Sequence, residues 1–160
     1  MDPNRPRGAF DRAFASFSAT RAGRLFSAKV VWKLDPYLLR ATRGRLGMGL
    51  MLPTALLETE GAKSGARRRN AVIYFHDGPT VTIVASKAGA PKHPAWFHNL
   101  TAHPEVAFGG IPMRAKVVED EAERQRIWQL ADRVFAPYET YRREAAAANR
   151  TIPIVQLNPR

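Results

Sequence analysis

Residues 55–75 read ALLETEGAKSGARRRNAVIYF and decide the predicted fold. The apolar segments at the two ends of this stretch, 55–57 and 71–75, are typical of β-strands. The glycines between them allow the backbone to bend sharply and to expose its N–H groups. The stretch therefore predicts a β-hairpin whose turn, residues 60–70, lies at the end of a sheet.

The predicted turn is strongly basic. Lys63 and the arginines at 67–69 bring positive charge to it, and Ser64 adds a small hydrogen-bond donor. Exposed amides with adjacent cations form an anion-binding concavity, and arginine offers a planar fork that suits phosphate or carboxylate. The alternative is a solvated basic loop, since a short run of charge usually lies on a wet surface. The turn is not a Walker A loop, because Ala62 stands where that motif has glycine.

Composition limits the class of protein. A chain of 160 residues, 45% of them hydrophobic, suits one domain with a real core and excludes a disordered protein. The chain has no cysteine, which excludes disulfides, thiolate metal ligands and a cysteine nucleophile. The formal charge of +11 favours an anionic partner: nucleic acid, an acidic membrane surface or a polyanionic small molecule.

The rest of the chain adds more strands than helices. Asp77-Gly78 is a hairpin signal after the strand predicted over 69–76. Further strands are predicted at 80–86, 105–108, 112–118 and 152–157. Helices are predicted from residue 93 to 102, after the capping box of Asp120 and Glu123, and beyond a short aromatic segment at 135–141. The pattern indicates an α+β, mainly β domain with antiparallel hairpins and disfavours a doubly wound parallel sheet.

The first 33 residues form a separate basic segment ahead of the domain predicted at 34–160. Phe10, Phe14 and Phe17 have helical spacing and alternate with cations. One interpretation is an amphipathic helix on an anionic membrane; the other is a helix packed on the domain. With no signal peptide and no run long enough to span a bilayer, we expect a cytoplasmic protein, peripheral on the inner face of the membrane under the first interpretation.

No catalytic apparatus made only of side chains is visible. The four histidines have no carboxylate cluster at ligand spacing, so no metal site is predicted, and there is no Gly-x-Ser-x-Gly elbow. A bound cofactor is therefore expected to supply the chemistry. A second small-residue loop, at 86–92, contains two lysines. Together with the basic turn at 60–70, it would suit an elongated anionic cofactor. Tyr138 and Tyr141 are candidate proton donors.

Three motifs in order resemble the deazaflavin-dependent nitroreductase family and its F420H2-dependent quinone reductases. They are LLETEGAKSG from Leu56 with Arg68 and Asn70, VASKAGAPKHPAWFHNL from Val84, and RTIPIV from Arg150. The resemblance implies a split β-barrel of the FMN-binding, pyridoxamine-oxidase type. It also implies coenzyme F420, an 8-hydroxy-5-deazaflavin with a phosphodiester and an oligoglutamate tail. Members of the family pass a hydride from the reduced cofactor to quinones, nitroaromatics and enones.

The resemblance also implies which residues form the site. Those implied for the cofactor are Lys63, Ser64, Gly65, Arg68 and Asn70, then Ser86, Lys87, Ala88, Gly89, Pro94 and Trp96, and lastly Tyr138. The first group is expected to hold the phosphate and tail, and core packing is the alternative for Trp96. Tyr138 and Tyr141 are expected to close over the ring and acceptor, with Tyr138 orienting or protonating the acceptor. Phe135 stands where a relative has tyrosine, so quinone or enone reduction is expected before nitroreduction.

Alternatives from other classes remain open. The fold is also compatible with FMN or haem, and a non-catalytic basic module on nucleic acid or anionic lipid has the same charge. Nucleic acid is not expected, because the basic turns lack interleaved aromatics and no binding motif appears. A small-molecule hydride acceptor is the expected partner, and the protein is expected to be a monomer or a homodimer.

Overall fold

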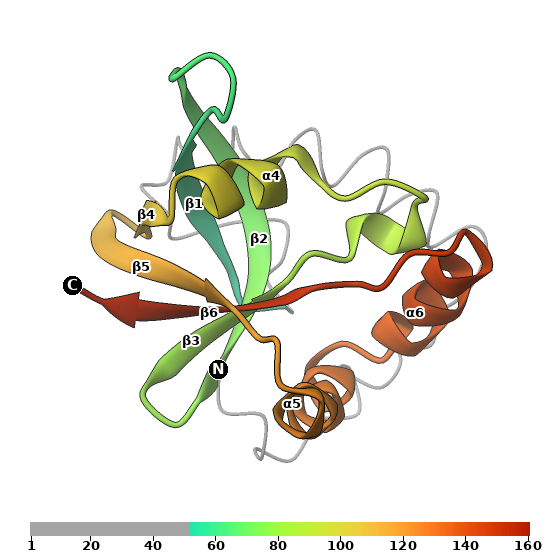
Figure 1. The fold of residues 1–160 in the computed structure, drawn as a ribbon. Helices are drawn as coiled ribbons and strands as arrows, with labels where there is room; N and C mark the ends of the chain where they lie inside the picture. The colour runs from blue at the N-terminus through green and yellow to red at the C-terminus, as the bar shows by residue number, and fades with distance from the viewer. Residues whose placement is uncertain (1–51) are drawn as a thin grey trace.

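The computed structural model describes residues 52–160, in which six strands close into an antiparallel barrel (Figure 1). The strands are β1 (Thr54–Glu60), β2 (Arg67–Asp77), β3 (Thr80–Val84), β4 (Glu105–Phe108), β5 (Ile111–Val117) and β6 (Ile154–Pro159). They follow one another around the barrel in the order β1-β2-β3-β6-β5-β4, and β4 returns to pair with β1. The predicted α+β, mainly β split barrel is confirmed. The predicted basic helical segment 1–33 lies outside the described residues.

The helices lie on the outside of the barrel. They are the 3-10 turn η2 (Lys87–Gly89), α4 (Ala95–Ala102), α5 (Glu121–Val134) and α6 (Pro137–Ala147). Helix α4 contacts β1 and β5, whereas α5 contacts β2 and α6, and α6 contacts η2 (Figure 1). Among the described residues, no helix has both the length and the hydropathy needed to cross a bilayer.

Two apolar clusters hold these layers together. The first fills the barrel and includes Leu57, Ile83 and Leu157, with Trp96 and Leu100 of α4 closing one end. Each side chain of this size that is fully buried contributes about 1.5–3 kcal/mol. The barrel interior is therefore a packed core, and a ligand has to bind outside it.

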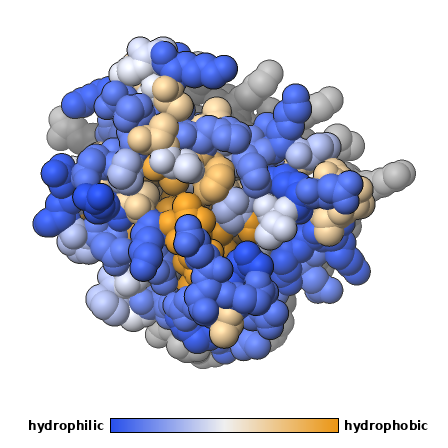
Figure 2. Space-filling model, viewed as in Figure 1, coloured by the Kyte–Doolittle hydropathy of each residue, from blue (hydrophilic) through white to orange (hydrophobic). Residues whose placement is uncertain are grey.

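The second cluster lies between the outer face of the sheet and the helices α5 and α6. It joins Phe75 of β2 and Ile154 of β6 to Ile127, Tyr138 and Tyr141. Figure 2 shows apolar side chains near the middle of one face, ringed by hydrophilic ones. The helical flank thus gives the domain its second core and brings the two predicted site tyrosines into it.

The hairpin and cap predictions are confirmed in detail. Gly78 has a φ of +58° in the turn between β2 and β3, as expected after Asp77. The Asp120 side chain accepts a hydrogen bond from the Glu123 backbone N–H at 2.7 Å, which starts α5.

Several predicted boundaries are wrong, among them the end of β3, at Val84 and not at residue 86, and the start of β6, at Ile154 and not at residue 152. β2 begins at Arg67 and not at residue 69, so the three arginines belong to the strand, because Arg69 and Arg67 pair across it with Glu58 and Glu60. The short aromatic segment at 135–141, which was expected ahead of the next helix, lies mostly inside α6, since Pro137 occupies the position where its fixed φ favours a helix start.

Candidate functional site

The pairing of β1 with β2 divides the basic residues between two faces. Leu57 lies opposite Asn70, and Thr59 lies opposite Arg68. Directly opposed residues share a face of the sheet, and Leu57 and Thr59 are 0% and 3% exposed. Arg68 and Asn70 therefore extend the core-facing side of the hairpin beyond the barrel, while Arg68 itself stays exposed.

The neighbouring arginine lies on the other face and is already paired. The Arg69 Nε donates to Glu58 Oε2 at 2.9 Å. Beside this pair is a cavity of about 440 Å³ that is lined by Glu58, Glu60 and Glu105 together with Arg67. Glu58 and Glu105 are themselves paired with arginines, so the positive and negative charges on this face of the hairpin offset one another.

The turn between β1 and β2 is tight, and the Lys63 side chain is exposed at its tip. The Gly61 N–H donates to Ala66 O at 2.9 Å, and Gly65 has a φ of +63°. A Cβ at Gly61 would lie 2.7 Å from the Ser64 Oγ and 3.2 Å from the Ala66 carbonyl oxygen, so a larger residue there would have to displace the Ser64 side chain. Lys63 and Ser64 are exposed at the tip of this turn.

Asn99 of α4 holds the turn in place, a role that the sequence analysis did not foresee. Its Nδ2 donates to Thr59 Oγ1 at 3.1 Å, and its Oδ1 accepts from the Ala62 N–H at 3.1 Å. The side chain is 8% exposed, so both bonds are sheltered from water. The only signal in the sequence was its position within the second motif.

The second predicted loop has an unusual backbone. Ser86 has the right-handed helical backbone conformation. The next three residues have positive φ angles of 48° at Lys87, 51° at Ala88 and 75° at Gly89. A left-handed residue other than glycine costs roughly 1–2 kcal/mol, so this loop must be held by its surroundings. A right-handed residue followed by a left-handed one forms a nest, whose N–H groups converge on an anion.

The loop is held from inside by Arg150. This side chain follows α6 and is 6% exposed. Its Nε donates to His93 Nδ1 at 3.0 Å and its Nη1 to Ser86 O at 3.0 Å. Two more bonds run from its guanidinium to the carbonyls of Ala85 and Ala90. Burial lowers the pKa of Arg150, but arginine stays protonated in proteins.

Gly89 brings this loop against α6. A Cβ at Gly89 would lie 2.7 Å from the Glu144 Oε2 and 3.2 Å from the Tyr141 Cα. Glycine is therefore required both by the positive φ and by the approach to the helix. This contact places Tyr141 beside the loop. A binding site that includes both Tyr141 and the loop needs them to be neighbours.

The two tyrosines lie in a closed aromatic group. Tyr138 is 2% exposed, with its ring centroid 5.1 Å from that of Phe135 and 6.4 Å from that of Tyr141. Burial raises the pKa of Tyr138, and the neighbouring Tyr141 and Asp132 raise it further. Its hydroxyl is therefore neutral and gives up its proton reluctantly.

Pro94 and Trp96 are placed by α4. Pro94 is the buried N-cap of that helix, and Trp96 is 3% exposed within the barrel core. The structure thus places Trp96 where the core-packing alternative expects it. Helix α4 links the two loops, since it follows the second in the chain and holds the first through Asn99.

Within residues 52–160, no group of three or more metal-ligating side chains lies together. The described residues thus form a basic turn that α4 holds through Asn99 and a second loop that contacts α6. Together they define an antiparallel barrel with two small-residue loops outside its core.

Comparison with known proteins identifies the family. The model of the F420H(2)-dependent quinone reductase family matches residues 33–159, and the chain belongs to that family. It is 36% identical over 135 residues to an F420H2-dependent quinone reductase of Mycobacterium tuberculosis, covering 80% of this chain and 89% of the relative.

Solved structures agree with this membership. An F420H2-dependent reductase, FDR-A, is 34% identical with a TM-score of 0.57, over 66% of this chain and 94% of its own. A domain-swapped dimer is 31% identical with a TM-score of 0.60, over 79% of this chain and 94% of its own. The resemblance seen in the sequence is confirmed: the chain is an oxidoreductase of a family that uses coenzyme F420, and the FMN alternative is not needed.

Proposed function

We propose that this protein transfers a hydride from reduced coenzyme F420 to a quinone. The family and the mycobacterial relative both support a quinone as acceptor. Enones are a second acceptor class, since they also take a hydride at an electron-poor carbon. Nitroaromatics are the weakest candidates, because Phe135 lacks the hydroxyl that a relative carries at this place.

The observation that carries the proposal is the separation of the arginines by the β1–β2 register. Arg68 and Asn70 lie on the core-facing side, while Arg69 is neutralised by Glu58 on the other. With the exposed Lys63 at the tip, this side offers cations and exposed N–H groups to a phosphodiester and a carboxylate-rich tail. The chemistry of these donors fits a polyanionic cofactor.

The second loop and α6 would complete the site. Residues that would hold the phosphate and tail are Lys63, Ser64, Gly65, Arg68 and Asn70, and those that would line the ring are Ser86, Lys87, Ala88 and Gly89. Pro94 and Trp96 would fix the start of α4 behind them. Bound in its reduced form, coenzyme F420 supplies the hydride.

The tyrosines would act on the acceptor. Tyr141 lies beside Gly89 and therefore nearer the loop. Tyr138 keeps a neutral hydroxyl, which suits it to donate a hydrogen bond where negative charge develops on the acceptor oxygen. The raised pKa argues for stabilising this charge and against full proton transfer in the rate-limiting step.

The experiment is a fluorescence titration of the purified protein with oxidised F420, with FMN as competitor. The matched pair of variants is Arg68→Ala and Arg69→Ala, which remove the same side chain from opposite faces of one strand. We expect tight binding that FMN does not displace, weakened about tenfold by Arg68→Ala and less than about threefold by Arg69→Ala. Equal effects of the two variants would contradict the assignment of the face, and absence of binding would contradict the function. Menadione is the first acceptor to assay with the reduced cofactor.

A further inference from the structure

Arg150 is the one charged residue among the buried residues of the described part of the chain. A buried cation costs free energy unless its donors are satisfied. The acceptors that its side chain contacts within residues 52–160 are three carbonyls and one imidazole nitrogen, all uncharged. Such a group contributes through the positions of its hydrogen bonds and not through ion pairing.

All of these acceptors belong to one loop that lies far from Arg150 in the sequence. The carbonyls of Ala85 and Ser86 precede the left-handed turn, and that of Ala90 follows it. The rigid fork of the guanidinium therefore holds the two ends of η2 together. The fourth acceptor is His93 Nδ1. His93 directly precedes Pro94, the N-cap of α4, so the guanidinium also contacts the segment that leads into this helix.

This grip has a consequence for the direction of the loop's N–H groups. The described residues contain no cis peptide bonds, and in a trans peptide the N–H of one residue points opposite to the carbonyl of the residue before it. Because the carbonyls of Ala85 and Ser86 point at Arg150, the N–H groups of Ser86 and Lys87 point away from it. Those N–H groups belong to the nest.

We propose that Arg150 is a positioning residue, which turns the carbonyls of residues 85, 86 and 90 inward and so presents the nest N–H groups to the anionic cofactor. The identity of the ligand rests on the proposed function, whereas the effect on the loop does not. The competing explanation is that Arg150 only fastens the connection between α6 and β6.

The test compares Arg150→Ala with Arg126→Ala, which removes an exposed arginine of α5. Hydrogen exchange of the cofactor-free protein is measured first. We expect faster exchange in residues 85–93 of Arg150→Ala, by about tenfold or more, and no change there in Arg126→Ala. Guanidinium ion, added as millimolar guanidinium chloride, should occupy the space left by the Arg150 side chain and slow this exchange again. Sodium chloride at the same concentration should not.

Binding and turnover are measured next. In Arg150→Ala the Kd for oxidised F420 should rise about tenfold, in line with the loss of a hydrogen-bonded anion site. The KM for the reduced cofactor should rise by a similar factor while kcat falls less than about threefold. Guanidinium should restore the affinity. A role confined to fastening α6 and β6 predicts none of these changes.

Each remaining outcome decides one question. Unchanged exchange in residues 85–93 of a folded Arg150→Ala would overturn the inference. If the wild type fails to bind F420, the proposed function falls, and the exchange data still decide whether Arg150 positions the loop. If Arg150→Ala does not fold, His93→Leu takes its place, since it removes a single acceptor; faster exchange in the loop would support the inference, and unchanged exchange would sink it.

Discussion

Arg126 and Arg150 use the same guanidinium group in opposite settings. The Arg126 side chain is 49% exposed and contacts two carboxylates, those of Asp77 and Glu123. Arg150 is 6% exposed and contacts only neutral acceptors within the described residues. One arginine is stabilised by opposite charge at the surface, the other by carbonyl oxygens in the interior.

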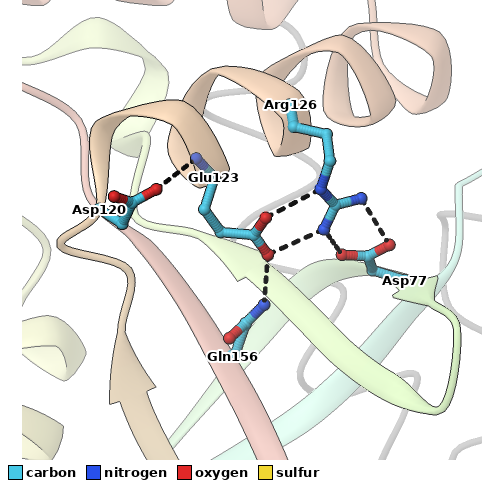
Figure 3. A network of polar contacts seen from close by, with 5 residues as sticks. All are labelled: Asp77, Asp120, Glu123, Arg126 and Gln156. Atoms are coloured by element: carbon cyan, nitrogen blue, oxygen red, sulfur yellow. Dashed lines mark hydrogen bonds and ion pairs between the residues drawn. The ribbon is translucent and has the colours of Figure 1, made fainter.

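The surface network is built across three elements, as Figure 3 shows. Arg126 of α5 reaches Asp77 at the end of β2, with Nη1 3.0 Å from Oδ1, and Glu123 accepts from Gln156 of β6 at 3.5 Å. The hydrogen bond from Arg126 lowers the pKa of Glu123, and the two carboxylates raise the pKa of Arg126. The network orients α5 on the barrel.

The two arginines stabilise different features of the molecule. Exposed ion pairs are screened by water and salt, so a network of this kind contributes little to stability. A buried guanidinium loses its hydration, and the carbonyls that replace water must lie in defined places. Arg126 therefore adjusts how a helix docks, whereas Arg150 specifies the backbone of a loop.

The largest expected effect is that of Arg150→Met on stability. Its loss removes the donor that Arg150 supplies to the carbonyls of Ala85 and Ala90 and one of the two donors to the Ser86 carbonyl, and we expect the free energy of unfolding to fall by about 2–4 kcal/mol. Urea denaturation measures it, with Arg126→Met as the control that removes the same charge. A smaller loss for Arg150→Met than for Arg126→Met would break the comparison.

Gly89→Ala sharpens the comparison at the loop itself. The new Cβ would clash with Glu144 and Tyr141 in addition to straining a φ of +75°, so we expect a loss of about 2–3 kcal/mol. Gly110→Ala is the matched control, because its φ is +85° and its Cβ would meet nothing within 4 Å. That control should cost about 1 kcal/mol. Equal melting temperatures for the two variants would show that the loop does not pack on α6 as described.

Arg126→Met should have a small effect that salt removes. We expect less than about 1 kcal/mol at low ionic strength and almost none at about 1 M salt, where the Debye length falls to about 3 Å. Thermal melts of the variant and the wild type at both salt concentrations give the measurement. A loss that persists at high salt would mean that the Arg126 side chain acts by packing.

The smallest effects are those of pH, and they separate the two sites. The pKa of His93 is lowered from 6.5 by burial, Arg150 and His98, so the folded state binds its proton less readily and loses stability as pH falls below 6.5. The Lys87 Nζ also lies near this residue, 3.5 Å from the His93 carbonyl oxygen.

The pKa of Glu123 is lowered from 4.5, so its contribution is lost only as pH falls below 4.5. Denaturation curves between pH 8 and pH 3 for His93→Gln and Glu123→Gln test this order. Each variant should flatten the pH dependence of stability in its own window. If Glu123→Gln alters the window near pH 6, the assignment is wrong.

The sequence predicted most of the fold because its signals are local. Asp77-Gly78 fixes a hairpin, and Asp120 with Glu123 starts a helix, each through neighbours a few residues apart. The boundary at Arg67 was predicted too late, because the pairing with Glu60 that extends the strand is visible only once the register is known.

The site was predicted less completely than the fold. Residue types and the family resemblance predicted the basic turn and the second loop as parts of the site. Asn99 and Arg150 occurred within the quoted motifs, but no role was predicted for them. Their roles depend on hydrogen bonds spanning 37 and 64 residues of sequence, from Ala62 to Asn99 and from Arg150 to Ser86. No periodicity encodes contacts of that kind.

By itself the sequence determined an antiparallel barrel, an excess of positive charge and a family that uses a polyanionic cofactor. These follow from local propensity, composition and motif, which need no knowledge of distant contacts. Only the tertiary structure decided which arginines of β2 share a face with core residues and which arginine is buried. Those outcomes depend on cross-strand register and burial, and they exist only after the barrel has closed.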